Sequence, residues 1–113
     1  MELFIAEQHS ERYFEFNFSP NGDWQSYEFL SYRSLLGQPK NIKPPIIDKL
    51  DNREGVSYSV SLDITPLSLA MPLQLGLSTV LLQACGGLAY FSLLPQTDTP
   101  DFHLREGFKL TLE

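Results

Sequence analysis

The sequence predicts an all-β fold, an antiparallel β-sandwich formed by one domain over residues 1–113. Apolar and polar residues alternate with a period of two along most of the chain, and the 3.6-residue period of an amphipathic helix is nearly absent. Turn signals built from Asn, Gly and Pro separate about seven short segments of this kind. A chain of 113 residues can bury one modest core.

The N-terminal part of the chain predicts three strands. We expect them at residues 2–7, 13–19 and 24–33. The second and third are joined by Pro20-Asn21-Gly22-Asp23, whose Asn-Gly centre is typical of a tight hairpin. The second strand should therefore lie beside the third.

The two faces of the second predicted strand differ in chemistry. Phe14, Phe16 and Phe18 alternate with Glu15 and Asn17, and successive side chains of a strand point to opposite faces. We expect the phenylalanines to fill the core. The carboxyl and amide groups should then meet either a ligand or a second layer of loops.

The middle of the chain predicts a loop and a strand. Residues 34–52 contain three prolines and read as a long loop with one helical turn near residues 46–50. Residues 56–64, VSYSVSLDI, alternate strictly and predict a half-buried strand.

The C-terminal part predicts three further strands, at residues 73–83, 88–94 and 108–113. Gly76 would mark a bulge or bend in the first, and Gly86-Gly87 would turn it into the second. Residues 95–107 should form a loop. In the last strand we expect Phe108, Leu110 and Leu112 to point inward.

Composition excludes several function classes. Fourteen acidic residues against eight basic ones give a net charge of −6, so nucleic-acid binding is disfavoured. The longest apolar-looking segment, residues 67–84, is interrupted by Pro, Gln, Gly, Ser and Thr, so we expect no membrane span. The N-terminus lacks the features of a secretory signal, and we expect a cytoplasmic protein.

Catalytic chemistry has weak support in the sequence. One Cys and two His are too few for a structural zinc site. A nucleophilic pair of Cys85 with His103 and a carboxylate pair of Glu15 with Glu28 are the candidates, but lone cysteines and exposed acidic pairs are usually passive. We therefore expect no enzyme. Calcium is an open alternative, with candidate oxygen ligands on Asn21, Asp23, Asp98 and Asp101.

A ligand site is the stronger hypothesis. Sugar sites combine a flat aromatic surface with polar groups that bond hydroxyls, and Glu15, Asn17, Trp24 and Arg33 would supply both. The alternative is structural: Trp24 closes the edge of the core, and Arg33 pairs with Glu28 or Glu15.

Four runs carry a resemblance to a known family. They are YFEFNFSPNGDWQSYEFLSYR (13–33), LGLSTVL (75–81), GGLAYFSLLP (86–95) and PDFHLREGFKLTLE (100–113). The chain resembles the bacterial DOMON-like family, which is related to the family-nine carbohydrate-binding modules. This resemblance implies a jelly-roll β-sandwich and a noncatalytic module for a carbohydrate-like ligand. The positions that match the ligand site are Glu15, Asn17, Trp24, Tyr27, Arg33, Asp101 and His103.

The same resemblance carries two further implications. Family members have several more strands before the position of Glu2, so the chain would correspond to the C-terminal part of the family's domain. Its incomplete sandwich would have an exposed strand edge, and a homodimer or a protein-interaction domain pairing through that edge is the alternative function. Other DOMON relatives hold haem through Met and His, which would here be Met71 and His103.

Overall fold

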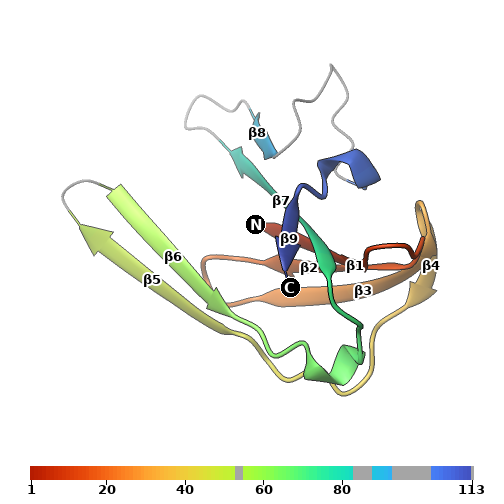
Figure 1. The fold of residues 1–113 in the computed structure, drawn as a ribbon. Helices are drawn as coiled ribbons and strands as arrows, with labels where there is room; N and C mark the ends of the chain where they lie inside the picture. Colours follow the sequence, from red (N-terminus) through yellow and green to blue (C-terminus); the bar gives the residue numbers. More distant parts are fainter. Residues whose placement is uncertain (53–54, 83–87, 93–102, 113) are drawn as a thin grey trace.

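The structure is a computed structural model that describes residues 1–52, 55–82, 88–92 and 103–112 (Figure 1). Within these residues, seven strands form one antiparallel sheet in the order β4-β3-β2-β1-β7-β8, with β9 also paired to β7, and β5 and β6 form a second sheet. Nine strands and two 3-10 turns are described: β1 (Glu2–Glu7), β2 (Tyr13–Phe18), β3 (Trp24–Ser31), β4 (Ser34–Gly37), β5 (Ile46–Asn52), β6 (Gly55–Ser61), η1 (Thr65–Leu67), β7 (Leu73–Leu82), β8 (Leu88–Ser92), η2 (Arg105–Gly107) and β9 (Leu110–Leu112). The all-β prediction is confirmed.

The predicted hairpin between β2 and β3 is confirmed. Phe18 pairs with Trp24, and Glu15 pairs with Tyr27 further along the ladder. The turn is closed by a hydrogen bond from the Ser19 amide to the Asp23 carbonyl, 2.8 Å long. Gly22 lies there at φ 97°, a backbone conformation that favours glycine.

The phenylalanine face of β2 forms the larger part of the core, as predicted. The buried side chains of this core are Ile5, Phe14, Phe16, Phe18, Leu67 and Leu73. Ile47 of β5 and Val60 of β6 pack against them, so one end of the small sheet lies on this face of the large one, while the rest of the hairpin projects away from it (Figure 1). Two layers therefore enclose this core, which is the arrangement of a sandwich-like fold.

The opposite face of the large sheet is also covered. A second core cluster contains Phe4, Ala6, Tyr13, Phe29 and Phe108. Phe108 follows η2, so the chain returns over this face after β8 (Figure 1). Of the two expectations for the polar face, a ligand or a second layer of loops, the structure shows the second over Glu15, because His103 and Phe108 lie on this face.

Two predictions for individual segments are wrong. Residues 34–52 are not a long loop with a helical turn, because they contain β4 and β5; the prolines fall between these strands, at residues 39–45. In the last strand Leu110 and Leu112 are 43% and 41% exposed instead of inward. β9 pairs with only three residues of β7, Leu73–Leu75, and neither of its leucines reaches a core cluster.

Gly76 has a different role from the predicted bulge. It pairs with Phe4 in an unbroken β1–β7 ladder. A Cβ atom at this position would lie 2.8 Å from Cδ1 of Phe108, so glycine gives the Phe108 ring room to lie on the sheet. The β7–β8 hairpin is confirmed by its ladder, and its Gly86-Gly87 turn lies outside the described residues.

Candidate functional site

Polar side chains gather on the second face of the large sheet because strand pairing aligns them. Across β2 and β1, Glu15 is level with Phe4, and Asn17 is level with Glu2. Glu2 is in turn level with Ser78 of β7, whose hydroxyl donates to Glu2 Oε2 at 3.2 Å. Three neighbouring positions of two strands thus carry two carboxyl groups and one amide.

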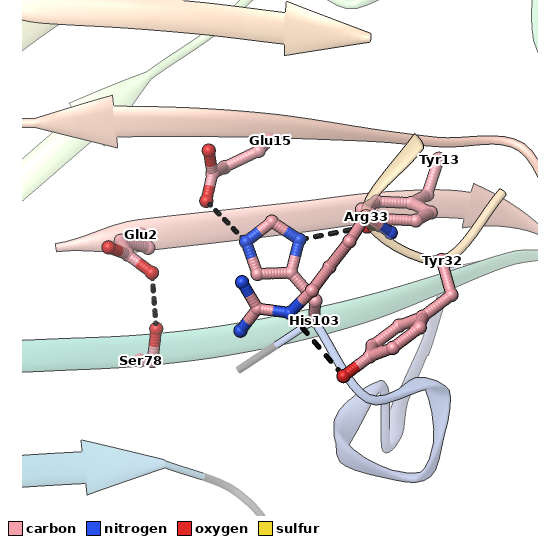
Figure 2. A network of polar contacts seen from close by, with 7 residues as sticks. All are labelled: Glu2, Tyr13, Glu15, Tyr32, Arg33, Ser78 and His103. Atoms are coloured by element: carbon pink, nitrogen blue, oxygen red, sulfur yellow. Dashed lines mark hydrogen bonds and ion pairs between the residues drawn. The ribbon is translucent and has the colours of Figure 1, made fainter. Parts of the chain in front are cut away.

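His103 lies over this polar face and is held by aromatic rings. Its imidazole meets Phe4 and Phe29 edge to face, with ring centroids 5.2 and 5.0 Å apart. Nδ1 is 2.8 Å from the Tyr13 hydroxyl, and Nε2 is 3.5 Å from Oε1 of Glu15 (Figure 2). The C-terminal segment is therefore tied to β2 by both nitrogens of one ring.

The direction of the hydrogen bonds around His103 follows from a backbone amide. The Arg33 N–H donates to the Tyr13 hydroxyl at 3.0 Å, so the hydroxyl's own proton is available to Nδ1 of His103. This arrangement favours the tautomer with hydrogen on Nε2. That hydrogen then faces the Glu15 carboxyl group.

Glu15 is buried, with 7% of its surface exposed. Burial and, to a smaller extent, the nearby carboxylate of Glu2 raise the pKa of the Glu15 carboxyl group to about 7, although the Asn17 amide and the Arg33 guanidinium oppose the rise. Glu15 therefore changes charge near neutral pH, where it can exchange a proton with its neighbours.

The β3–β4 turn brings Arg33 to the site. Ser31 pairs with Ser34, so Tyr32 and Arg33 form a two-residue turn, and Arg33 lies at φ 54°. This left-handed conformation is uncommon for a residue other than glycine. Figure 2 shows both turn side chains beside His103, with Arg33 Nε donating to the Tyr32 hydroxyl at 3.4 Å.

We refer to Glu2, Tyr13, Glu15, Asn17, Arg33 and His103 as the His103 cluster. Two open hollows adjoin it, near opposite ends of β1. The Asn17 hollow, of about 660 Å³, is lined by Met1, Glu2, Asn17, Phe18, Ser19, Gly22, Asp23, Trp24 and Gln25. The Arg105 hollow, of about 460 Å³, is lined by Gln8, His9, Ser10, Glu11, Tyr13, Tyr32, Gln74, His103 and Arg105.

One atom of the Asn17 hollow stands out. Among the described residues, Oδ1 of Asn17 is the one buried side-chain oxygen or nitrogen that has no hydrogen-bond partner. Burying an amide oxygen without a partner is costly, on the order of 1–3 kcal/mol. Asn17 lines the hollow, but this oxygen is shielded from it, so a bound molecule would reach Oδ1 only after the amide turns.

The structure brings together four of the seven predicted site residues, namely Glu15, Asn17, Arg33 and His103. Tyr27 shares their face, because it pairs with Glu15. Trp24 does not: it lies on the opposite face, packed against the phenylalanine core, and only lines the Asn17 hollow. Its position agrees with the structural alternative, in which Trp24 closes the core edge.

The position of Glu28 decides two further expectations, its pairing with Arg33 and its pairing with Glu15. Glu28 forms an ion pair with Arg12, with the two atoms 3.0 Å apart. The expected pairing of Arg33 with Glu28 is therefore wrong. Glu28 is level with Phe14, on the face opposite Glu15, and the two carboxyl groups cannot act on one bond. Asp101 lies outside the described residues.

Sequence reasoning missed the contributions of Glu2, Tyr13 and Arg105. Tyr13 was detectable, because it alternates in step with Glu15 and Asn17 on β2. Glu2 becomes visible only when β1 is aligned with β2, and Arg105 reaches the site from a distant part of the chain.

The donor sets for cofactors are incomplete in the described part of the chain. A haem held by Met71 and His103 would require His103 to release Tyr13 or Glu15, because both ring nitrogens are engaged. The described residues contain no group of three or more His, Cys, Asp or Glu able to hold a metal ion. Cys85 and Asp98, proposed for a nucleophile and for calcium, lie outside them.

No family model, curated protein or solved structure matches this chain. The described residues also include no helix with the length and hydrophobicity that crossing a membrane requires.

Proposed function

We propose that the protein is a noncatalytic binding module for a carbohydrate-like ligand, and that the ligand occupies the Asn17 hollow. The observation that carries this proposal is the unpaired Oδ1 of Asn17, which is itself shielded although the residue lines an open hollow. Rotation of the Asn17 amide would turn this oxygen into the hollow, where a ligand hydroxyl would supply the missing donor. Forming that bond removes the cost of the unpaired oxygen, which favours the bound state.

The other walls suit a neutral polyhydroxylated molecule. Glu2 and Asp23 offer carboxylate acceptors and Gln25 offers an amide, while the half-buried Trp24 contributes an aromatic surface. Sugar recognition combines such a surface with polar groups for hydroxyls. The lining holds two carboxylates and one cation, the Met1 ammonium group, which donates to the Phe18 carbonyl, so its net negative charge disfavours an anionic ligand. The resemblance to carbohydrate-binding modules supports the same ligand class.

A noncatalytic role fits the carboxyl groups of the site. Glycoside hydrolysis uses two carboxyl groups about 5–10 Å apart on either side of one bond. Glu15 is buried beneath His103, and Glu28 lies on the other face of the sheet. Glu28 and Glu15 therefore cannot act together on one bond.

The experiment is a fluorescence titration of the purified chain with neutral mono- and oligosaccharides. Trp24 is the single tryptophan of the chain, so its emission reports on the Asn17 hollow directly. We expect a saturable change with one sugar class, and we expect Asn17→Ala to weaken binding about fivefold or more because a buried hydrogen bond is lost.

The matched control is Gln38→Ala, which removes an exposed amide outside both hollows. It should leave the dissociation constant unchanged. A flat titration with every sugar, or equal binding by Asn17→Ala and the unmodified chain, contradicts the proposal.

A second function, a protein-interaction domain that pairs through an open sheet edge, is favoured by β4. This strand ends the large sheet, and its Leu35 and Leu36 are 60% and 57% exposed. An apolar outer strand can add a strand from another chain. If this function holds, the elution mass is that of a homodimer, and Leu35→Lys shifts it to the monomer while the circular dichroism spectrum is retained.

A further inference from the structure

The Arg105 hollow contrasts with the Asn17 hollow in charge. Arg105 is its one Arg or Lys among the lining residues, with His9 and His103 beside it and the carboxylate of Glu11 at the rim. The protein as a whole has a net charge of −6, whereas the formal charges of Arg105 and Glu11 balance in the lining of this hollow.

Arg105 is held in a fixed orientation. Its Nε donates to Gln74 Oε1 at 2.9 Å, and its Nη2 donates to the Glu7 carbonyl at 2.6 Å. The guanidinium also lies 5.4 Å from the centre of the Phe108 ring. These contacts order the side chain before any ligand arrives, which lowers the entropy cost of binding.

The bonding capacity of Arg105 is not exhausted. A guanidinium has five N–H donors, and in the part of the chain that the structure describes Nη1 has no hydrogen-bond partner. Burial lowers the pKa of Arg105 from its usual value, because it disfavours the charged form. A bound anion would offset that cost.

We propose that the Arg105 hollow is a second binding site, which takes the phosphate or carboxylate group of a small anionic molecule. Arg105 supplies the charge and the remaining guanidinium donors, which match the oxygen geometry of both groups. The exposed ring of Tyr32 forms a wall for the rest of the molecule, and the hydroxyl of Ser10 adds polar contact. The site is separate from the Asn17 hollow and does not depend on sugar binding there.

The experiment is an NMR titration of the ¹⁵N-labelled full chain with inorganic phosphate and then with succinate. Sodium chloride at matched ionic strength is the reference. We expect a saturable shift of the Arg105 Nε–H signal and of the His9 and Tyr32 signals with phosphate or succinate. Trp24 emission should stay unchanged, which separates this site from the Asn17 hollow.

Two substitutions test the site, and they should change the affinity for anions in opposite directions. One removes the negative charge of Glu11, and the other replaces the planar guanidinium of Arg105. Glu11→Gln removes the carboxylate at the rim and should tighten anion binding about twofold, a gain that loss of structure cannot produce. Arg105→Lys keeps the charge but loses the planar fork, and should weaken binding about fivefold or more. The control Arg12→Lys alters an arginine outside the hollow and should have no effect.

The proposal is overturned if chloride produces the same shifts, or if the shifts grow linearly without saturation. It is also overturned if Glu11→Gln leaves the dissociation constant unchanged. Should Arg105→Lys fail to fold, Glu11→Gln still decides, because Glu11 is exposed and makes no hydrogen bond or ion pair through its side chain with the described part of the chain.

Discussion

The hydroxyl of Tyr13 and Nδ1 of His103 are joined by a 2.8 Å hydrogen bond although the two residues stand 90 positions apart in the sequence. The same hydroxyl accepts the backbone amide of Arg33. Three segments of the chain, namely β2, the β3–β4 turn and the segment before η2, therefore meet at one buried oxygen.

Removing this oxygen should destabilise the fold. Tyr13→Phe leaves the Arg33 amide and the His103 ring without their partner, so we expect the free energy of unfolding to fall by about 1–2 kcal/mol. Urea denaturation measures it. Tyr32→Phe, at a side chain that is 54% exposed, is the matched control and should change little. Equal effects of the two substitutions would show that the Tyr13 hydroxyl has no structural importance.

The raised pKa of Glu15 makes stability depend on pH. The carboxyl group ionises near pH 4.5 in the unfolded chain and near pH 7 in the folded protein, so the folded state binds more protons between these values. The free energy of unfolding should therefore fall as pH rises through this window, by at most about 3 kcal/mol from this group.

Glu15→Gln isolates this contribution. The neutral amide resembles the protonated carboxyl group, so the variant should match the unmodified protein near pH 4.5 and exceed its stability at pH 8. Glu2, Arg33 and His103 face Glu15, so the difference between the two curves measures Glu15 together with its coupling to these neighbours. Parallel curves of stability against pH would refute the raised pKa.

Gly76 is predicted to tolerate no side chain. In Gly76→Ala the new Cβ would lie 2.8 Å from Cδ1 of Phe108, so the ring must move and we expect a loss of about 1–3 kcal/mol. Thermal unfolding measures the loss. Combining the change with Phe108→Leu should cost less than the sum of the two single changes, because the steric conflict disappears.

Arg33 combines an unfavourable backbone with a favourable charge. Arg33→Gly relieves the left-handed conformation at φ 54°, by about 1 kcal/mol, and so offsets part of the lost side-chain contacts. It also removes the cation that lowers the Glu15 pKa, which should rise further above 7. An NMR titration of the Glu15 carboxyl carbon measures this; an unchanged or lower pKa would contradict the assigned role of Arg33.

Local patterns were enough to predict much of the large sheet. The alternation in β2 gave the correct face for Phe14, Phe16 and Phe18, and Asn-Gly gave the correct hairpin. β5 was not predicted, because the three prolines that precede it are typical of a loop. Hydrogen bonding to β6 stabilises this strand although its local sequence does not favour one.

The site was predicted less completely, because its residues come from segments that lie far apart in the sequence. Alternation on one strand places Glu15 and Asn17 together, but it says nothing of which later residue covers them. Trp24 was grouped with them as a residue of the same site, whereas its pairing with Phe18 places it on the other side of the sheet. Arg105 is held by hydrogen bonds to Gln74 and Glu7, which are distant in the sequence, and no local pattern predicts these contacts.

The pairing of β1 with both β2 and β7 has a consequence for folding during synthesis. Residues 2–7 can pair with β2 as soon as it is made, but their other side stays open until residues 73–82 have left the ribosome. Until then the nascent chain presents an unpaired inner strand with Phe4 and Ile5 uncovered on one or both faces. Sheets built on such distant partners fold slowly, and their intermediates are prone to aggregate. We therefore expect this chain to complete its fold after translation of β7 and to benefit from chaperones before that point.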